Sequence, residues 1–267
     1  MSGPLSRIFT ACIEDGPQEG SRDSKQQLWS FVLDFKHFNG FSLPLKDMQI
    51  FFGLNATGVL DSDTLEVMRN PRCGVPDVEE YSAIQGTRWN KNVITYRYRL
   101  IGRYTRDLPR STVDSLIESA FSVWARASGL TFVSSHTRSA DIMVEFVTHE
   151  HGDLYPFDGP RGTLAHAFGP GLGVGGDTHF DDDERWTAGE TGFNLFVVAA
   201  HEFGHALGLK HSRNPGSLMY PTYTSLHPAN LLSREDVANI NALYSKHFWN
   251  YSYIFESYML YRHIPTK

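Results

Sequence analysis

The chain has 267 residues, a length that suits one or two domains. Hydrophobic residues make up 41% of it, charged residues 20%, and the net charge of −6 gives no reason to expect nucleic-acid binding. No apolar run reaches the ~20 residues that a membrane-spanning helix needs, and the two cysteines allow at most one disulfide.

The first 80 residues divide into a polar segment and a small helical unit. Residues 1–25 are rich in Gly, Ser, Asp and Gln, which predicts disorder, and they lack the apolar core of a secretory signal. Over residues 26–80 the apolar spacing becomes helical, and Asp61 and Ser62 are candidate helix caps. The stretch "NPRCGVPDV" breaks this periodicity with two prolines and a glycine, so we expect a boundary near residue 80.

Strand and helix patterns alternate in the following part of the chain. Val93 opens an alternating stretch, and a longer helical stretch starts near Pro109 and ends at Gly129. Ser233 is a candidate cap for the last helix. The expected elements are strands over 93–100, 130–135 and 140–147, a loop-rich stretch over 148–192, and helices over 109–129, 194–208 and 233–246, before an aromatic-rich tail over 247–267.

The stretch "VVAAHEFGHALGLKH" places three histidines and a glutamate in an otherwise almost wholly apolar or glycine sequence. His201 and His205 are four residues apart, so on a helix both imidazoles can reach one metal ion. Gly208 permits a left-handed turn that can bring His211 back as a third ligand. Three nitrogen ligands leave the open position of a catalytic zinc, and Glu202 can take a proton from water there. A buried helix with incidental histidines is the alternative, and the register of all five positions argues against it.

These five residues match the signature of the metzincin peptidases, and "SLMYP" resembles their Met-turn, with Met219 beneath the metal. The stretch "PRCGVPDV" (71–78) resembles the propeptide switch of the matrix metalloproteinases. A thiolate is a good zinc ligand, so Cys73 can fill the fourth position and keep the enzyme latent. The alternative is an inert cysteine. The resemblance further implies that Arg72 pairs with Asp77 to hold this loop.

The resemblance implies an α+β fold, with a helical propeptide followed by a metzincin catalytic domain. That domain would contain a twisted five-stranded mixed sheet and three helices over residues 81–246. The implied function is that of a latent, secreted zinc endopeptidase that cleaves extracellular matrix proteins. The alternative is a catalytically silent metal-binding splice form that acts as a decoy or an inhibitor-binding module.

A second metal-binding region is expected within residues 151–184, which are rich in histidine, acidic residues and glycine. A plain solvated loop is the alternative, but so long a loop without regular structure needs another source of order. Oxygen donors suit calcium, and the "DDDE" run would repel itself without cations. By resemblance, a closed structural zinc site uses His151, Asp153, His166 and His179. By the same resemblance, two or three calcium ions use Asp158, Asp181 and Glu184 with carbonyls of Gly159, Arg161 and Thr163; Asp141 and Asp177 with carbonyls of Gly173 and Gly175; and Asp107 with Asp182.

The resemblance also implies how substrate binds. An extended peptide would lie along an edge strand, with one side chain in a pocket beside the zinc. Val197 is small, so we expect the pocket to accept medium to long apolar side chains such as leucine. Within the family, "PFDGPRGTLAHAF" looks most like the enamelysin-like members. The expected pocket residues are Leu164, Val197, Val198, Leu218, Tyr220 and Tyr223.

The remaining expectations concern partners. They are extended peptide segments of matrix proteins, an activating protease and proteinaceous metalloproteinase inhibitors, with no nucleic acid, no membrane span and a monomeric state. No hinge or hemopexin domain follows residue 246 in this sequence, so we do not expect it to cleave intact triple-helical collagen.

Overall fold

The computed structural model describes residues 42–77, 88–98, 104–137, 139–224 and 230–244. The predicted N-terminal disorder, the predicted boundary near residue 80 and the predicted tail lie outside the described residues. Among the helices that are described, none combines the length and the apolarity needed to cross a bilayer.

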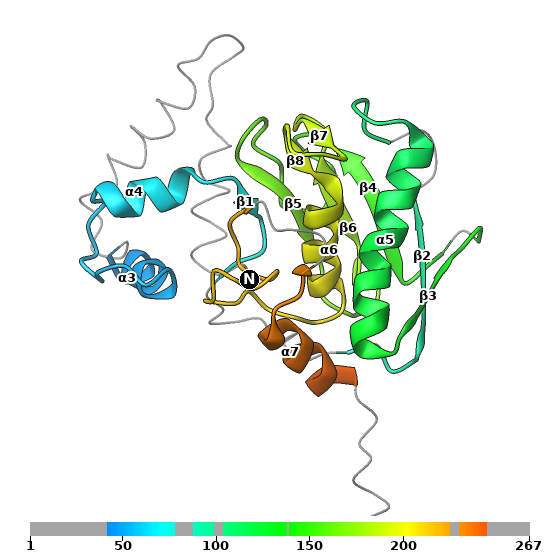
Figure 1. Ribbon diagram of the computed structural model, residues 1–267. Helices are drawn as coiled ribbons and strands as arrows, with labels where there is room; N and C mark the ends of the chain where they lie inside the picture. Colours follow the sequence, from blue (N-terminus) through cyan, green and yellow to red (C-terminus); the bar gives the residue numbers. More distant parts are fainter. Residues whose placement is uncertain (1–41, 78–87, 99–103, 138, 225–229, 245–267) are drawn as a thin grey trace, which may run out of the picture.

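Two short helices, α3 (Ser42–Phe51) and α4 (Ser62–Arg69), form a unit to one side of the sheet (Figure 1). Asp61 is the N-cap of α4 and accepts a hydrogen bond from the Thr64 amide at 2.9 Å, which confirms the predicted cap. The buried Gln49 side chain joins the two helices, since its amide nitrogen donates to Thr64 Oγ1 at 2.9 Å and its oxygen accepts from the Gly58 amide at 2.8 Å. The predicted helical unit is therefore held by polar contacts as well as by apolar packing.

The main sheet has six strands in the order β1-β5-β6-β4-β2-β3, and all neighbours are parallel except the antiparallel pair β5–β6. The expected five-stranded mixed sheet is present, and β1, from the predicted propeptide, is a sixth strand on its β5 edge. A separate pair of strands, β7 and β8, is parallel. The strands are β1 (Arg72–Cys73), β2 (Val93–Tyr98), β3 (Thr131–Ser134), β4 (Ile142–Val147), β5 (Thr163–Ala167), β6 (Thr178–Asp181), β7 (Trp186–Thr187) and β8 (Phe193–Asn194).

The prediction of a loop-rich stretch over residues 148–192 is wrong in part, because β5, β6 and β7 lie within it. All four residues of β6 are buried between β4 and β5, so no alternation of polar and apolar residues marks it in the sequence. His166 of β5 and His179 of β6 are register partners, so two polar residues sit at paired, buried positions of the sheet. A buried histidine needs a hydrogen-bond or metal partner, and hydrophobic periodicity alone does not predict a strand that is buried for this reason.

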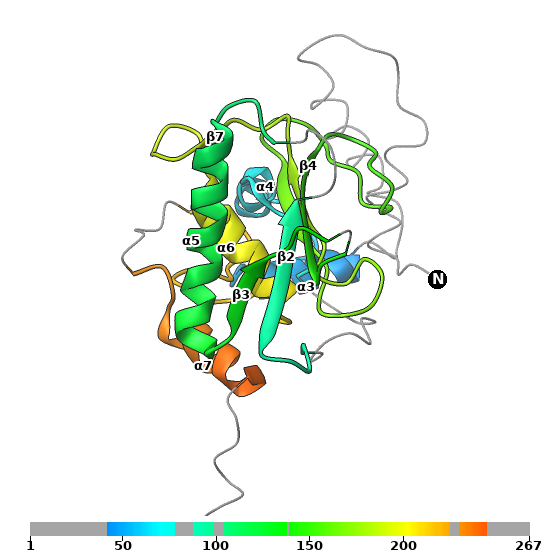
Figure 2. The same cartoon turned by 90° about the vertical axis from the view of Figure 1, so that its right-hand side faces the viewer.

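Helices α5 (Arg110–Ser128) and α6 (Leu195–Ala206) pack together on one face of the sheet (Figures 1 and 2). Phe121 and Phe203 stack with ring centroids 3.7 Å apart, and the indole of Trp124 donates to the Ala200 carbonyl at 2.7 Å. The helix predicted over 109–129 ends as expected, since Gly129 has a φ of 72°. This packing fixes the position of α6, which carries most of the candidate site.

The last helix, α7 (Arg234–Tyr244), begins with the predicted cap. The Ser233 hydroxyl accepts a hydrogen bond from the Asp236 amide at 3.1 Å, and the Asp236 carboxylate accepts from the Ser233 amide at 2.7 Å. The buried Asp236 carboxylate also accepts from the Leu218 amide at 2.9 Å and from the Ser217 hydroxyl. Through Asp236, α7 therefore holds the turn that runs beneath α6.

Candidate metal centres and the switch segment

Three histidine nitrogens converge at the end of α6. Nε2 of His201 lies 3.2 Å from Nε2 of His205 and 3.3 Å from Nε2 of His211. A tetrahedral zinc with Zn–N bonds of about 2.0–2.1 Å would separate its nitrogen ligands by about 3.3 Å. The donor set and its spacing therefore fit a zinc ion, as the sequence predicted for these three residues.

The outer nitrogens of the two helical histidines are fixed by backbone carbonyls. Nδ1 of His201 lies 2.7 Å from the Leu218 carbonyl oxygen, and Nδ1 of His205 lies 2.8 Å from that of Leu209. A carbonyl can only accept, so each ring carries its proton on Nδ1 and turns a lone pair on Nε2 toward the centre. Burial lowers the pKa of both rings, to about 3 for His201, which keeps them neutral and able to bind a metal.

The turn after α6 brings the third histidine back to the other two. Gly208 has a φ of 100° and its amide donates to the His205 carbonyl at 2.8 Å, which confirms the left-handed exit predicted there. Met219 is buried against α6, and a Cβ added to Gly204 would meet the Met219 sulfur at 2.4 Å. Glycine at 204 is therefore required for the Met219 turn to lie this close to the histidines, a feature that the sequence analysis missed.

The fourth group at this centre is Cys73, which comes from strand β1 of the predicted propeptide. Its sulfur and the ligand nitrogens of the three histidines all lie within 4.8 Å of one another. The strand is fixed on both sides, because the Cys73 amide donates to the Pro221 carbonyl at 2.9 Å and the Gly74 amide to the Ala165 carbonyl at 2.8 Å. Burial, together with the nearby Glu202 carboxylate, raises the pKa of the thiol well above its usual value. A cation at the centre would reverse that effect.

Glu202 is a buried carboxylate that makes no hydrogen bond to the described part of the fold. Neither of its oxygens has a hydrogen-bond partner among the described residues, and burial raises its pKa to about 8. The Cys73 thiol lies close enough to affect this pKa, although it does not make a hydrogen bond of ordinary geometry. A buried carboxylate without partners is costly for stability, and such groups are typical of catalytic sites.

Arg72 and Asp77 form the ion pair predicted from the switch motif, with Arg72 Nη2 2.6 Å from Asp77 Oδ1. The same oxygen lies 2.9 Å from Nδ1 of His211, a contact that the sequence analysis did not anticipate. Burial acts to raise the pKa of Asp77, but His211 and Arg72 outweigh it and hold the pKa below its usual value. The motif therefore contacts the histidine cluster through a carboxylate as well as through the thiol.

All six residues predicted for the substrate pocket line one cavity, which also touches His201 and Glu202. Arg72 and Cys73 line the same cavity, so the switch segment lies at its mouth. The turn that follows α3 reaches this region too, because the Phe52 ring packs edge-on against the Tyr220 ring at a centroid distance of 5.8 Å. The predicted pocket, the switch segment and the histidine cluster thus form one continuous site.

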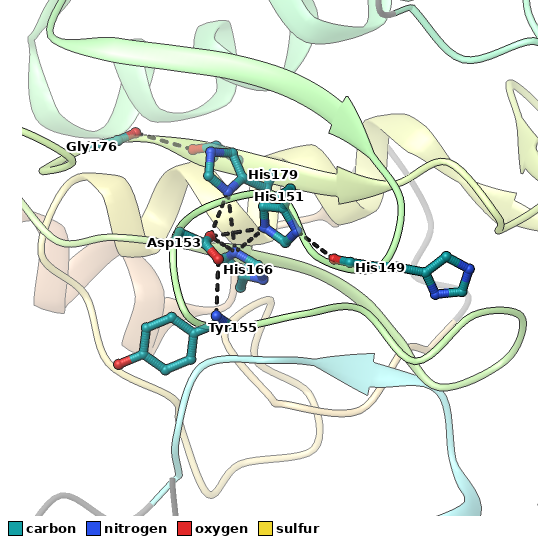
Figure 3. A network of polar contacts seen from close by, with 8 residues as sticks. His149, His151, Asp153, Tyr155, His166, Gly176 and His179 are labelled. Atoms are coloured by element: carbon teal, nitrogen blue, oxygen red, sulfur yellow. Dashed lines mark hydrogen bonds and ion pairs between the residues drawn. The ribbon is translucent and has the colours of Figure 1, made fainter. Parts of the chain in front are cut away.

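A second cluster includes residues of β5 and β6 and is shown in Figure 3, where His151, Asp153, His166 and His179 point toward one another. Oδ2 of Asp153 lies 2.9, 2.6 and 2.8 Å from ring nitrogens of His151, His166 and His179 respectively. The His151 ring is further fixed by the His149 carbonyl, 2.7 Å from its Nδ1. Four converging donors fit the closed coordination of a structural zinc, as predicted.

Three of the predicted calcium ligands, Asp158, Asp181 and Glu184, form an acidic group in which Asp181 and Glu184 are buried and Asp158 is exposed. Burial is the main reason that the pKa of Asp181 rises to about 6 and that of Glu184 to about 7, and the nearby Asp158 raises both further. Oδ2 of Asp181 has no hydrogen-bond partner among the described residues. Two of the three residues predicted to supply carbonyl donors here are tied to these carboxylates, since the Arg161 amide donates to Glu184 at 2.5 Å and the Thr163 amide donates to Asp158 at 2.8 Å. Clustered, partly unsatisfied carboxylates fit a hard cation.

The other two predicted calcium sites receive less support. Both carboxylate oxygens of Asp141 are engaged, by Lys91 at 2.5 Å and by the Thr95 amide at 2.7 Å, so its backbone carbonyl is the more available donor. Asp177 is buried at the end of the loop that contains Gly173 and Gly175. In the third site, burial raises the pKa of Asp182 and nearby Asp107 adds to the effect, while the Asp107 carboxylate accepts from the Trp186 amide at 2.8 Å.

Comparisons with known proteins agree with this geometry. The Peptidase_M10 family model, Matrixin, matches residues 88–245. The chain is similar to human Matrix metalloproteinase-20, with 53% identity over 208 residues that cover 77% of this chain and 42% of that protein. It is also similar to human Matrilysin, with 48% identity over 231 residues that cover 85% of each. The chain thus spans less than half the length of the first relative and most of the second.

Proposed function

Because the chain belongs to the matrixin family and is a zinc-dependent endopeptidase of the matrix metalloproteinase kind, we propose that Glu202 is its general base and that Cys73 keeps it latent. His201, His205 and His211 would hold the catalytic zinc, which supplies a Lewis acid for the scissile carbonyl and lowers the pKa of water. The observation that carries the proposal is the buried, unpartnered carboxylate of Glu202 beside three converging imidazoles.

Glu202 is suited to move a proton during hydrolysis. It can accept a proton from the attacking water and deliver that proton to the amine that leaves. Burial raises its pKa, and a cation held by the three histidines would lower it again, toward the range in which a carboxyl group can exchange a proton in both directions. The free oxygens of Glu202 mean that no hydrogen bond of the fold has to break for this transfer.

The substrate we propose is an extended peptide segment of an extracellular matrix protein. Such a segment would pair with the edge of β5, where β1 now pairs, and would place one side chain in the pocket beside His201. Val197 and Leu164 give that pocket buried apolar walls, which favours a medium to long apolar side chain such as leucine. Because β1 and the substrate compete for one edge, the propeptide must leave before cleavage.

Latency follows from the position of the switch segment. Cys73 would take the fourth zinc position, and the Arg72–Asp77 ion pair would hold the loop there. Activation would then require an activating protease to cut the propeptide, or chemical modification of the thiol. By family, we further propose that the protein is secreted, acts as a monomer and is recognised by proteinaceous metalloproteinase inhibitors.

The 151–184 region would hold the remaining ions. We propose a structural zinc on His151, Asp153, His166 and His179, and calcium on the Asp158, Asp181 and Glu184 group. These ions would stabilise the fold and take no part in the reaction, because the four protein donors leave no open position at the zinc. The second and third calcium sites are part of the same proposal.

The decisive experiment is cleavage of a fluorogenic peptide with leucine after the scissile bond, before and after propeptide removal. We expect no cleavage by the intact chain, cleavage by the processed chain, and loss of cleavage with a zinc chelator that zinc restores. A processed chain that contains two zinc ions and still does not cleave peptides would favour the silent metal-binding form instead.

A further inference from the structure

The third histidine of the α6 cluster differs from the other two in what faces its outer nitrogen. Carbonyls of Leu218 and Leu209, which belong to the catalytic part of the chain, face Nδ1 of His201 and His205. The group next to Nδ1 of His211 is the carboxylate of Asp77, 2.9 Å away, which belongs to the propeptide. Removal of the propeptide therefore leaves two of the three outer contacts in place and takes away the third.

The contact between Asp77 and His211 is buried and held from both sides. The His211 side chain is 1% exposed and that of Asp77 is 10% exposed. Arg72 lies 2.6 Å from the same Asp77 oxygen and also donates from Nε to the Cys73 carbonyl at 3.1 Å. The carboxylate oxygen lies to one side of the direction in which the ring N–H would donate, so the contact is a close electrostatic one. Nδ1 of His211 has no hydrogen-bond partner among the described residues, so the Asp77 carboxylate is the charged group that faces it.

We propose that Asp77 is a positioning residue for His211, and that the switch segment therefore strengthens zinc binding at two points in the latent chain. One point is the Cys73 thiol on the metal. The second is the Asp77 carboxylate, which orients the His211 ring and increases the donor strength of its Nε2. Partners of this kind are worth about 10–100-fold in metal affinity. This inference rests on the proposed function, since it requires zinc at the three histidines.

The inference gives the propeptide a role besides blocking the site. A chain that folds with its propeptide attached would capture zinc with all three rings held, and propeptide cleavage would leave an active site that retains zinc less tightly. This loss is separate from the loss of the thiol ligand, because Asp77 and Cys73 act on different atoms.

The experiment separates the two contributions in the full chain. A Glu202→Ala, Cys73→Ser background prevents autolysis and removes the thiol ligand. In that background, Asp77, Asp77→Asn and Asp77→Ala are compared by competition with a chromogenic zinc chelator. We expect the dissociation constant of the weaker-held zinc to rise about 10–100-fold in Asp77→Ala. Asp77→Asn should lie between, since it keeps an oxygen of the same shape but loses the charge.

The structural zinc is the internal reference, because none of its four donors comes from the propeptide. It should stay bound in all three chains, which shows that each variant is folded. Equal dissociation constants for the weaker-held zinc in Asp77 and Asp77→Ala would overturn the inference. A His211→Ala variant in the same background distinguishes a failure of this inference from a failure of the proposed function. If it too leaves zinc retention unchanged, the ligand assignment of the proposed function is wrong.

Discussion

Within the part of the chain that the structure describes, imidazole nitrogens converge at two places, and these two clusters differ in where the fourth donor comes from. In the cluster of His151, Asp153, His166 and His179 (the loop cluster), Asp153 lies two residues from His151 and contacts all three histidines. In the α6 cluster the fourth donor is Cys73, from a strand that only pairs with the edge of the sheet. The loop cluster is closed by a residue two positions from one of its own histidines, whereas the α6 cluster is closed by a residue far from its histidines in the sequence.

The two clusters also differ in what surrounds the donors. A carboxylate is central to the loop cluster, where the three histidines outweigh the effect of burial and hold the pKa of Asp153 far below its usual value. Next to the α6 cluster, the Glu202 carboxylate has no such contacts, and burial raises its pKa. A metal site becomes reactive when a donor position can open and a free base remains beside it.

Glu202→Ala should abolish most activity without loss of zinc. In the processed enzyme we expect kcat to fall about 10²–10⁴-fold, because a general base is lost while all three nitrogen ligands remain. Turnover on a fluorogenic peptide and zinc content by atomic absorption would measure both effects. The matched control, Glu202→Gln, keeps the shape of the side chain and should be equally inactive. Stoichiometric loss of zinc, or turnover close to wild type, would show that Glu202 has another role.

Asp153→Ala should affect stability instead of chemistry. It leaves three buried histidines without their common carboxylate, a change expected to cost about 3–5 kcal/mol in the free energy of unfolding. We expect one zinc per chain to be lost and the melting temperature to fall. Processed material that stays folded at low temperature should keep most of its turnover. A variant that keeps both zinc ions would contradict the assigned site.

Calcium removal should loosen the 151–184 region before it affects the α6 cluster. A site that is saturated 100-fold above its dissociation constant contributes about 2.7 kcal/mol, which corresponds to a fall of about 5–10 °C in melting temperature. The reason is the repulsion among Asp158, Asp181 and Glu184, which burial strengthens. Scanning calorimetry with a calcium-selective chelator, together with limited proteolysis, would measure it. An unchanged melting curve would count against these sites.

Cys73→Ser should make the unprocessed chain active. A serine hydroxyl stays protonated at neutral pH and is a poor zinc ligand, and each 1.4 kcal/mol of lost binding opens the fourth position about tenfold more often. We therefore expect at least a tenfold increase in peptide cleavage by freshly purified, unprocessed chain. The control is Ser62→Ala, an exposed change on α4 that leaves the switch segment untouched. Equal activity of wild type and Cys73→Ser would mean that Cys73 does not keep the enzyme latent.

Much of the candidate site can be predicted from the sequence, because its ligands are close along the chain. The spacing of His201 and His205 needs only the pitch of one helix, and the return of His211 needs only the left-handed turn at Gly208. The caps at Asp61 and Ser233 are local for the same reason. A short-range rule of backbone geometry fixes each of these features before any packing is considered.

Tertiary structure alone decided the features that depend on distant residues. The buried strands β5 and β6 carry no hydrophobic alternation, since their neighbours on both sides supply the burial. The approach of Met219 to Gly204, the anchoring of the turn by Asp236, and the contact of Asp77 with His211 each join segments with no common local pattern. Spacing along a helix determines which side chains share a face, but only the packing of separate segments determines which group faces the far side of a ligand.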